Sequence, residues 1–324
     1  MLDIARDPRW GRVAEGAGED PYLDVQMGVA MVKGYQGEDL SDPTSMAACI
    51  KHFVGYGAAE GGRDYNSTMI SERSLRNTYF PAFKAAAEAG AATLMTSFNE
   101  IDGIPSTGNK WLLKDILRDE WGWDGMIVTD WNSAGEMIAH GFSRDLKHTA
   151  EQAINAGVDM DMMSYGFIQY AEELVKEGKV SEKEIDRAVR NILKLKFELG
   201  LFENPYLEPH KSQAIVGNPD FMKAGFDVQL KSIVMLKNHN KTLPIAPTTK
   251  VYIEKREFTP QTDWWTETKK GKSKMGYGVS IDMLRKHLNI VENPAEADCA
   301  VVFIDGPTVG RGHSLADVEA GGNG

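Results

Sequence analysis

Short apolar runs alternate with longer amphipathic segments along the first two hundred residues. Apolar runs of this length predict buried parallel strands. The predicted strands are 2–5, 47–53, 91–99, 125–130 and 158–163. The segments between and after them carry apolar residues at helical spacing. The predicted helices are 20–36, 71–90, 110–121, 148–157, 166–177 and 181–199.

Residue types at the helix ends agree with these boundaries. Ser71 is suited to cap the second helix, and Gly90 is suited to end it. Ser181 is followed three residues later by Glu184, and this spacing predicts a capping box. Repeated strand–helix units predict an α/β fold with a parallel sheet covered by helices.

Five predicted strands are fewer than the eight of a closed (β/α)8 barrel. Two interpretations remain at this point. Either the sheet is open, or about three strand–helix units of a barrel precede Met1. The glycine-rich end, "LADVEAGGNG", completes no element, so we expect an interior portion of a longer protein.

The stretch "LGLFENPYLEPH" (199–210) is typical of a domain exit because it combines prolines with polar residues. We therefore expect a first domain over 1–206, a linker over 207–218 and a partial second domain over 219–324. The second domain is predicted to contain a helix at 219–236, strands at 250–254 and 299–305, and a helix at 280–288. A charged surface loop is expected at 254–278.

Composition excludes some classes of function. The chain has 324 residues and a net charge of −11, which argues against sequence-independent nucleic-acid binding and against anionic membranes. No apolar run approaches the roughly 18 residues that span a bilayer. Cys49 and Cys299 are expected to be free, buried thiols. No signal peptide is recognised, so the compartment stays open, and a homo-oligomer is compatible with the sequence.

Polar and aromatic residues recur where the predicted strands end. Because active sites of α/β barrels lie at the carboxyl ends of the strands, these residues are expected to converge on one pocket. They are Arg6, Arg9 and Arg12, then Lys51 and His52, then Met95, Phe98 and Asn99, then Asp130 and Trp131, and finally Asp159 and Asp161.

This set of side chains suits a sugar, which has apolar faces and a rim of hydroxyl groups. An indole such as Trp131 can stack on a face, and charged groups can bond the rim. Asp130 could attack an anomeric carbon and form a covalent glycosyl intermediate.

Each residue also has a simpler interpretation. Asp130 alone could be an ordinary loop or cap residue, and Trp131 could serve packing. Lys51 could be part of a structural pair or a Schiff-base lysine. Asp159 and Asp161 could ligate a metal, but no histidine or further acidic cluster accompanies them, so no metal and no cofactor is expected.

Five sequence blocks together carry a resemblance to a known family. They are "DPRWGRVAEGAGEDPYL", "KHFVGYGAAEGGRDYN", "STGNKWLLKDILRDEWGWDGMIVTDW", "AINAGVDMDM" and "VMLKNHNKTLPI". In their order and spacing they resemble glycoside hydrolase family 3 over most of residues 1–245. The resemblance implies a TIM-like (β/α)8 barrel whose N-terminal units are missing from this chain, followed by part of an α/β sandwich domain.

The resemblance also implies a role for each matching residue. Asp130 would be the nucleophile, and Arg12, Lys51 and His52 would bind the sugar rim. Arg63, Met95, Phe98 and Trp131 would complete the substrate-binding set. Phe98 stands where many members carry tyrosine, which removes one hydroxyl contact.

Two features of the family lack a firm match. The family's barrel contributes a sugar-binding aspartate before "DPRWGR", in a part that this chain does not contain. Its acid/base glutamate lies in the second domain, where this chain offers Glu319, with Asp317 as the other acid. The family's N-acetylglucosaminidase branch uses a "GHGDT"-like loop, but "GYGAAEGG" stands here, so that branch is rejected.

The expected function is a retaining, exo-acting β-glycosidase that releases terminal β-linked glucose or xylose from oligosaccharides through a covalent glycosyl–aspartate intermediate. Two alternatives are an inactive or sugar-binding piece on the same scaffold and a Schiff-base lyase that uses Lys51. The resemblance suggests a periplasmic or secreted protein.

Overall fold

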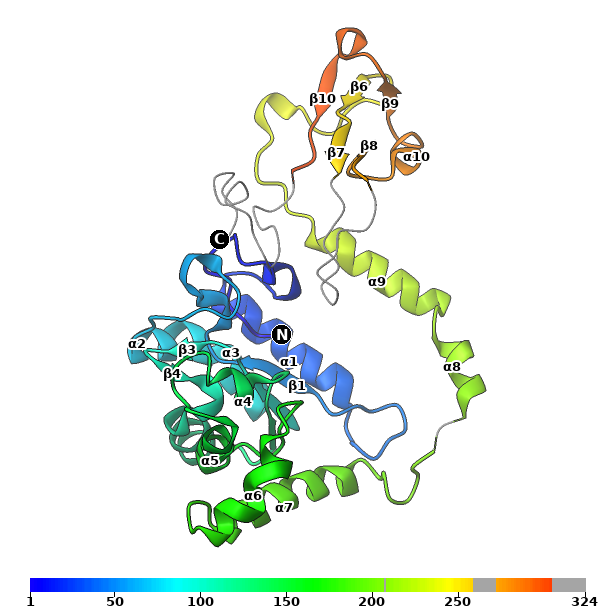
Figure 1. Cartoon of the computed structure of the whole chain (residues 1–324). Helices are drawn as coiled ribbons and strands as arrows, with labels where there is room; N and C mark the ends of the chain where they lie inside the picture. Colours follow the sequence, from blue (N-terminus) through cyan, green and yellow to red (C-terminus); the bar gives the residue numbers. More distant parts are fainter. Residues whose placement is uncertain (207, 259–271, 305–324) are drawn as a thin grey trace. The chain divides into compact units, whose positions relative to one another are not determined.

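The computed structural model describes residues 1–206, 208–258 and 272–304 (Figure 1). These residues fall into two compact units that divide at residue 206, and each unit is described by itself below. Both combine helices with parallel strands, so the α/β class is confirmed.

A three-stranded parallel sheet forms the middle of the first unit. Its strands, in spatial order, are β1 (Cys49–Phe53), β2 (Thr93–Thr96) and β5 (Met126–Val128). Beyond β5, Met160 makes a single bridge to Val128. The Leu2 N–H donates to the Lys51 carbonyl at 2.6 Å, and because β2 occupies one edge of β1, Leu2 lies along the other edge. Five segments therefore lie in the order in which the chain presents them.

The outer two of these segments are not strands, and their prediction as strands is wrong. Residues 2–5 leave β1 after the Leu2 bond, because the Ala5 N–H turns to the Gly18 carbonyl instead. Residues 158–163 make one bridge to β5 and then bond to the loop that follows it, where the Asn132 N–H donates to the Met162 carbonyl at 2.8 Å. Met163 adopts a left-handed backbone conformation with φ 70°. Apolar composition predicted both segments, but neither finds a continuous ladder of partners.

The predicted helices are confirmed as helical segments, and α4 is an addition to them. The α-helices are α1 (Pro21–Gln36), α2 (Glu72–Ser74), α3 (Phe80–Glu88), α4 (Ser133–Glu136), α5 (Leu146–Ala156), α6 (Gly166–Lys176) and α7 (Glu182–Glu198). Leu75–Tyr79 and Trp111–Glu120 are π-helical, and Val13–Glu15, Tyr56–Ala58, Glu60–Gly62 and Ser106–Gly108 are short 3₁₀ turns. A hairpin pairs β3 (Glu100–Ile101) with β4 (Ile104–Pro105).

Side-chain caps fix several helix starts. Ser71 accepts a hydrogen bond from the Ser74 N–H at 3.3 Å, as predicted. Ser181 stands at the start of α7 but makes no side-chain cap, so the predicted capping box is wrong. The Glu184 carboxylate is instead held by Lys114 at 2.7 Å and Arg187 at 3.0 Å. Tertiary ion pairs have replaced the local bond.

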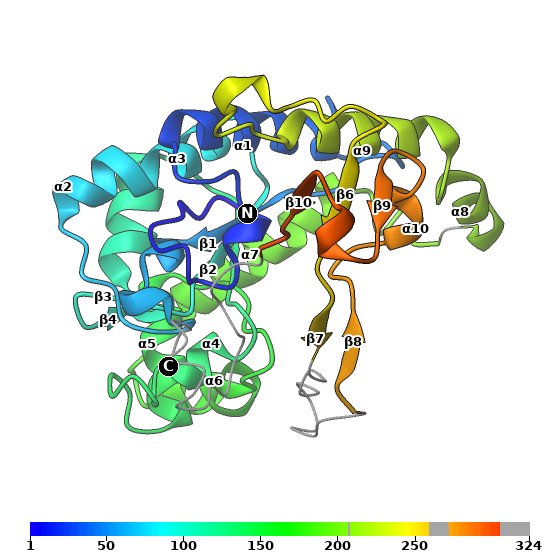
Figure 2. The ribbon, with the colours of Figure 1, turned by 90° about the horizontal axis from the view of Figure 1, so that it is seen from above.

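The core lies between the sheet and helices α1 and α3, which run side by side (Figure 2). Phe53, Leu94 and Ile127 provide one buried side chain from each strand. The Phe53 ring packs edge-on against Phe83 of α3 with 5.2 Å between centroids. Burying a side chain of this size stabilises the fold by about 1.5–3 kcal/mol, so this layer holds the strand ends in place.

A buried carboxylate connects α7 to the sheet. Asp159 accepts hydrogen bonds from the Ile127 N–H at 2.8 Å and the Arg118 guanidinium at 3.2 Å. Arg187 of α7 also donates to it, and Asn191 donates at 3.0 and 3.1 Å. Four partners from three elements identify Asp159 as a structural anchor of α7.

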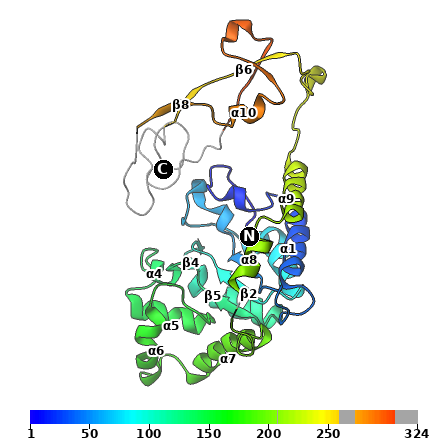
Figure 3. The same cartoon turned by 90° about the vertical axis from the view of Figure 1, so that its right-hand side faces the viewer.

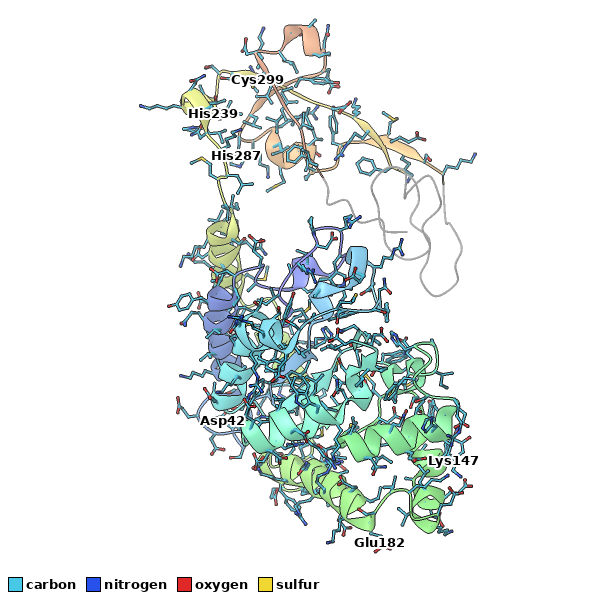
Figure 4. All side chains as sticks on the ribbon, turned by 90° about the vertical axis from the view of Figure 1, so that its left-hand side faces the viewer. Asp42, Lys147, Glu182, His239, His287 and Cys299 are labelled. Carbon is cyan, nitrogen blue, oxygen red and sulfur yellow. The ribbon has the colours of Figure 1, made fainter. Side chains whose placement is uncertain are left out.

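Helices α5 and α6 lie side by side on the outside of the unit (Figure 3). Lys147 on α5, labelled in Figure 4, pairs with Glu173 at 2.7 Å and Glu177 at 2.6 Å on α6. Solvent-exposed pairs of this kind contribute about 0–1 kcal/mol each.

The second unit contains a parallel sheet in the order β10–β6–β9. Its elements are α8 (Pro209–Ile215), α9 (Pro219–Ser232), the turn His239–Lys241, β6 (Lys250–Ile253), β7 (Arg256–Phe258), β8 (Lys274–Gly276), α10 (Ile281–Leu284), β9 (Asn289–Val291), the turn Pro294–Glu296 and β10 (Cys299–Val301). The segment expected to be a loop at 254–278 contains the antiparallel pair β7–β8, and the expected linker contains α8.

Two expectations about composition can be compared with the described residues. Cys49 on β1 is a free thiol, and so is Cys299 on β10, which Figure 4 labels. Cys49 is exposed and Cys299 is half-buried, so their expected burial is wrong. Within the described ranges, no helix combines the length and the apolar character that a membrane span requires.

An unpaired carboxyl lies inside the first unit. Asp24 on α1 is 1% exposed, and neither carboxyl oxygen has a hydrogen-bond partner among the described residues. Burial, together with the charge of Asp3, raises its pKa to about 6. When the pKa of a carboxyl is higher in the folded state than in the unfolded state, the folded protein is destabilised as pH rises between the two values. Here the unfolded pKa is about 4 and the folded pKa about 6.

We therefore expect Asp24→Asn to remove part of the pH dependence of stability. Wild-type protein should lose about 3 kcal/mol of unfolding free energy between pH 4 and pH 7 through this group. The variant should lose less over the same range, as measured by urea unfolding at each pH. Equal slopes for the two proteins would contradict the assignment.

Candidate active site

Residues from β1 and from the loop after β5 meet at the carboxyl end of the sheet. His52 lies on β1, and Asp130 follows β5 after Thr129. Nε2 of His52 lies 3.3 Å from Oδ2 of Asp130, and both side chains are largely buried, with exposures of 1% and 13%. Parallel strands present their carboxyl ends at the same edge, which is why these distant positions converge.

Asp3 holds the other side of the His52 ring. Its Oδ2 accepts from His52 Nδ1 at 2.9 Å and from the His52 backbone N–H at 3.0 Å. Both side chains are almost fully buried. The two bonds fix the orientation of the ring, as a carboxylate commonly does for a functional histidine.

Arg12 approaches the same ring. Its Nη2 lies 3.3 Å from His52 Nε2, and since a guanidinium only donates, this bond requires a lone pair on Nε2. Arg12 also donates to both carboxylate oxygens of Glu15, at 2.6 and 2.9 Å. These hydrogen bonds hold the pKa of Glu15 below its usual value. The Arg12 side chain is thereby fixed beside His52.

The two oxygens of Asp130 have different surroundings. Oδ1 accepts from the Trp131 backbone N–H at 2.6 Å. Oδ2 is buried and makes no hydrogen bond to any described residue, although it lies 3.3 Å from His52 Nε2. One carboxylate oxygen is therefore oriented by the backbone, while the other has no hydrogen-bond partner among the described residues.

Aromatic rings pack together beside His52, and this cluster, in which Trp10, Tyr56 and Phe98 are buried, is called the aromatic wall below. It consists of Trp10, Tyr56, Tyr65 and Phe98. Tyr56 packs against His52 with 5.3 Å between centroids, against Trp10 at 5.1 Å and against Phe98 at 5.7 Å. Phe98 and Tyr65 lie 4.4 Å apart. The wall thus begins at the histidine that touches Asp130.

Two further acids lie near the wall and Asp130. Asp64 accepts from the Trp10 indole N–H at 3.1 Å. Glu136 on α4 is half-buried, and burial, with the charges of Asp130 and Asp64, raises its pKa to about 7. One side of the site is therefore cationic, through Arg12 and Lys51, and another side is acidic.

The remaining predicted residues occupy varied positions. Lys51 precedes His52 on β1, and Met95 lies on β2 opposite Val128 in the strand register. Trp131 is 48% exposed beside Asp130. Arg63 is exposed, and the described contacts do not join it to Asp130 or His52.

The candidate acid Glu319, like Asp317, lies outside the described residues.

Several residues of the site were not predicted. They are Asp3, Glu15, Tyr56, Asp64, Tyr65 and Glu136. Asp3 carried a usable signal, since a charged residue within an apolar run is buried only with a partner. Asp64 and Tyr65 directly follow Arg63 in "GGRDYN", so the block that predicted Arg63 also contained the signal for them. Among the described residues no group of three or more possible metal ligands occurs.

Curated proteins similar to this chain include enzymes named for two activities. The periplasmic beta-glucosidase of Salmonella typhimurium is 43% identical over 250 residues, which cover 76% of this chain and 33% of that protein. A putative beta-xylosidase of Formosa agariphila is 38% identical, with 75% of this chain and 33% of that protein covered. The chain thus spans about a third of the length of these relatives.

Solved structures give the same grouping. The beta-glucosidase from Listeria innocua in complex with isofagomine matches with a TM-score of 0.77 and 37% identity, over 99% of this chain and 44% of that one. A mutant of the same enzyme was solved with laminaribiose and matches with a TM-score of 0.76. The model of the glycosyl hydrolase family 3 N-terminal domain matches residues 1–195. Since that match covers more than half of the sequence, the chain belongs to glycoside hydrolase family 3.

Proposed function

We propose that the chain is the catalytic part of a retaining, exo-acting β-glycosidase that releases terminal β-linked glucose or xylose. The observation that carries this proposal is Asp130, whose Oδ1 is oriented by the Trp131 N–H and whose Oδ2 makes no hydrogen bond within the described chain. It is supported by relatives named beta-glucosidase and beta-xylosidase and by a neighbour solved with glucose.

The proposed fold is a (β/α)8 barrel of which this chain contributes the later units. The order 2–5, β1, β2, β5 and 158–160 supports it, because neighbours in sequence are neighbours in space, as in a barrel. A doubly wound sheet would reverse its strand order at a switch point. We also propose 1–206 as the catalytic domain, 207–218 as the linker and 219–324 as part of an α/β sandwich.

In the proposed reaction, Oδ2 of Asp130 attacks the anomeric carbon from the face opposite the leaving group. The bond to the leaving oxygen breaks, and that oxygen takes a proton from a carboxylic acid, for which Glu319 is the candidate. Water then attacks the anomeric carbon of the glycosyl–aspartate ester and gives its proton to the carboxylate that had acted as the acid. The bond to Asp130 breaks, and Asp130 is released as a carboxylate. Two inversions at one carbon restore the β configuration.

The rim of the sugar would be bound by charged groups around Asp130. Arg12 is already fixed there by Glu15, and His52 is fixed by Asp3. Lys51 and Arg63 are proposed as further donors to hydroxyl groups. Met95, Phe98 and Trp131 are proposed to contact the apolar faces of the ring, which charged groups alone could not recognise.

We expect Asp130→Asn to lower turnover of aryl β-glycosides by about 10³-fold or more, because the covalent route is lost. Asp115→Asn is the matched control, since Asp115 is exposed on the helical segment Trp111–Glu120. Initial rates on p-nitrophenyl β-glucoside and β-xyloside measure the effect. Retention of a tenth of wild-type activity would exclude Asp130 as the nucleophile.

Chemical trapping tests the same assignment directly. A 2-deoxy-2-fluoro-β-glycosyl fluoride should inactivate the wild-type protein and label the peptide that contains Asp130, because the fluorine slows hydrolysis of the ester. Mass spectrometry of the digested protein locates the label. Labelling of another carboxylate would contradict the proposed mechanism.

We expect Asp3→Asn to lower kcat/KM by about ten- to a hundredfold, since a second residue that orients a functional histidine commonly contributes that much. The amide oxygen can still accept both hydrogen bonds from His52, but without the negative charge these bonds are weaker and hold the ring less firmly. Asp24→Asn serves as the control, because it neutralises a buried carboxyl that makes no bond to His52. Similar losses in both variants would mean that removal of a buried negative charge, not ring orientation, is responsible.

A further inference from the structure

A histidine that the proposed mechanism does not use joins two loops of the site. His140 follows α4, and its side chain is 14% exposed. Its Nε2 lies 3.1 Å from the Phe98 carbonyl oxygen, which can only accept, so Nε2 carries the hydrogen. Its Nδ1 lies 4.0 Å from Oε2 of Glu100. The ring therefore connects the segment after Asp130 to the segment after β2.

The residue that His140 holds has few other restraints. Phe98 lies beyond the end of β2 at Thr96, so no strand ladder fixes it. Within the described chain, its only backbone hydrogen bond is the one from His140. The neighbouring Ser97 and Asn99 are bonded to β1 and its continuation, at Phe53 and Val54. Their bonds hold the chain on either side but leave the Phe98 carbonyl to His140.

Displacement of Phe98 would move the aromatic wall. Its ring contacts Tyr65 at 4.4 Å and Tyr56 at 5.7 Å, and Tyr56 contacts His52 at 5.3 Å. A close-packed interior transmits such shifts because it has few voids to absorb them. The position of Phe98 is thus coupled to the ring that touches Asp130.

We propose that His140 is a positioning residue that sets the place of Phe98, and through it of the aromatic wall, for binding the sugar ring. The inference rests on the proposed function, because it assigns the wall to the same substrate. It differs from a purely structural role in one respect: the effect of His140 on binding must pass through the ring of Phe98.

A double-mutant cycle tests this route. The variants are His140→Leu, Phe98→Leu and the double variant in the 324-residue chain. Single His140→Leu should weaken isofagomine binding about tenfold and raise KM for p-nitrophenyl β-glucoside by the same factor. The kcat should change less than about twofold. A factor of about ten corresponds to the loss of one hydrogen bond. In the Phe98→Leu background, His140→Leu should change isofagomine binding and KM by less than about twofold.

Two amide variants of different length test whether the side chain must reach the Phe98 carbonyl or need only be polar. They also serve in place of His140→Leu if that variant does not fold. His140→Gln places an amide N–H near the position of Nε2 and should restore binding to within about threefold of wild type. His140→Asn is too short to reach the Phe98 carbonyl and should not. His148→Leu is the control, since His148 is a half-buried histidine on α5 without a contact to Phe98.

The outcomes distinguish this inference from the proposed function. If the wild-type chain turns over no aryl glycoside but the isofagomine dissociation constants follow the pattern above, the proposed function fails and the role of His140 stands. An undiminished effect of His140→Leu in the Phe98→Leu background would overturn the role of His140. Equal binding by the Gln and Asn variants, or no isofagomine binding by the wild type, would overturn it as well.

Discussion

The placement of His52 between two carboxylates is the constraint on which the first unit depends. Asp3 comes from the first residues of the chain, His52 from β1, and Asp130 from the loop after β5. Buried polar groups need partners, and Asp3 supplies one to both the ring and the backbone of His52. Asp130 approaches the other ring nitrogen, and one of its oxygens has no hydrogen-bond partner among the described residues, which agrees with its proposed role as the nucleophile.

Two kinds of surface meet at this contact. On one side, Arg12 and Glu15 form a fixed charged pair against the ring. On the other side, the buried rings of Tyr56 and Phe98 pack beside it. The pyranose proposed as the ligand offers hydroxyl groups at its edge and carbon–hydrogen bonds on its faces, a combination that suits charged groups next to aromatic carbon. A purely charged pocket would suit a phosphate or a metal better.

Apolar periodicity predicted most helices and the three sheet strands of the first unit. The parallel direction of those strands predicted that residues at their carboxyl ends meet. Helices α1, α3, α5, α6 and α7 and strands β1, β2 and β5 overlap predicted segments, because apolar spacing reflects burial on one face. The convergence of His52 and Asp130 followed from parallel strands ending at one edge. The partners of Ser181 and Asp3 were not predictable, since a side chain's choice between a local bond and a distant one is made by the tertiary structure. The failed strands at 2–5 and 158–163 have the same cause, because a strand exists only where a neighbour completes its hydrogen bonds.

The order of strands in the first unit bears on how the protein is made. Within the parallel sheet, β2 pairs with β1 and β5 pairs with β2, so each strand meets the sheet strand made before it while later residues are still on the ribosome. The bond between Leu2 and Lys51 forms within the first part of this chain, whereas Asp130 reaches His52 after β5 has emerged. The growing chain can therefore bury its framework early, whereas Asp130 gains its surroundings later.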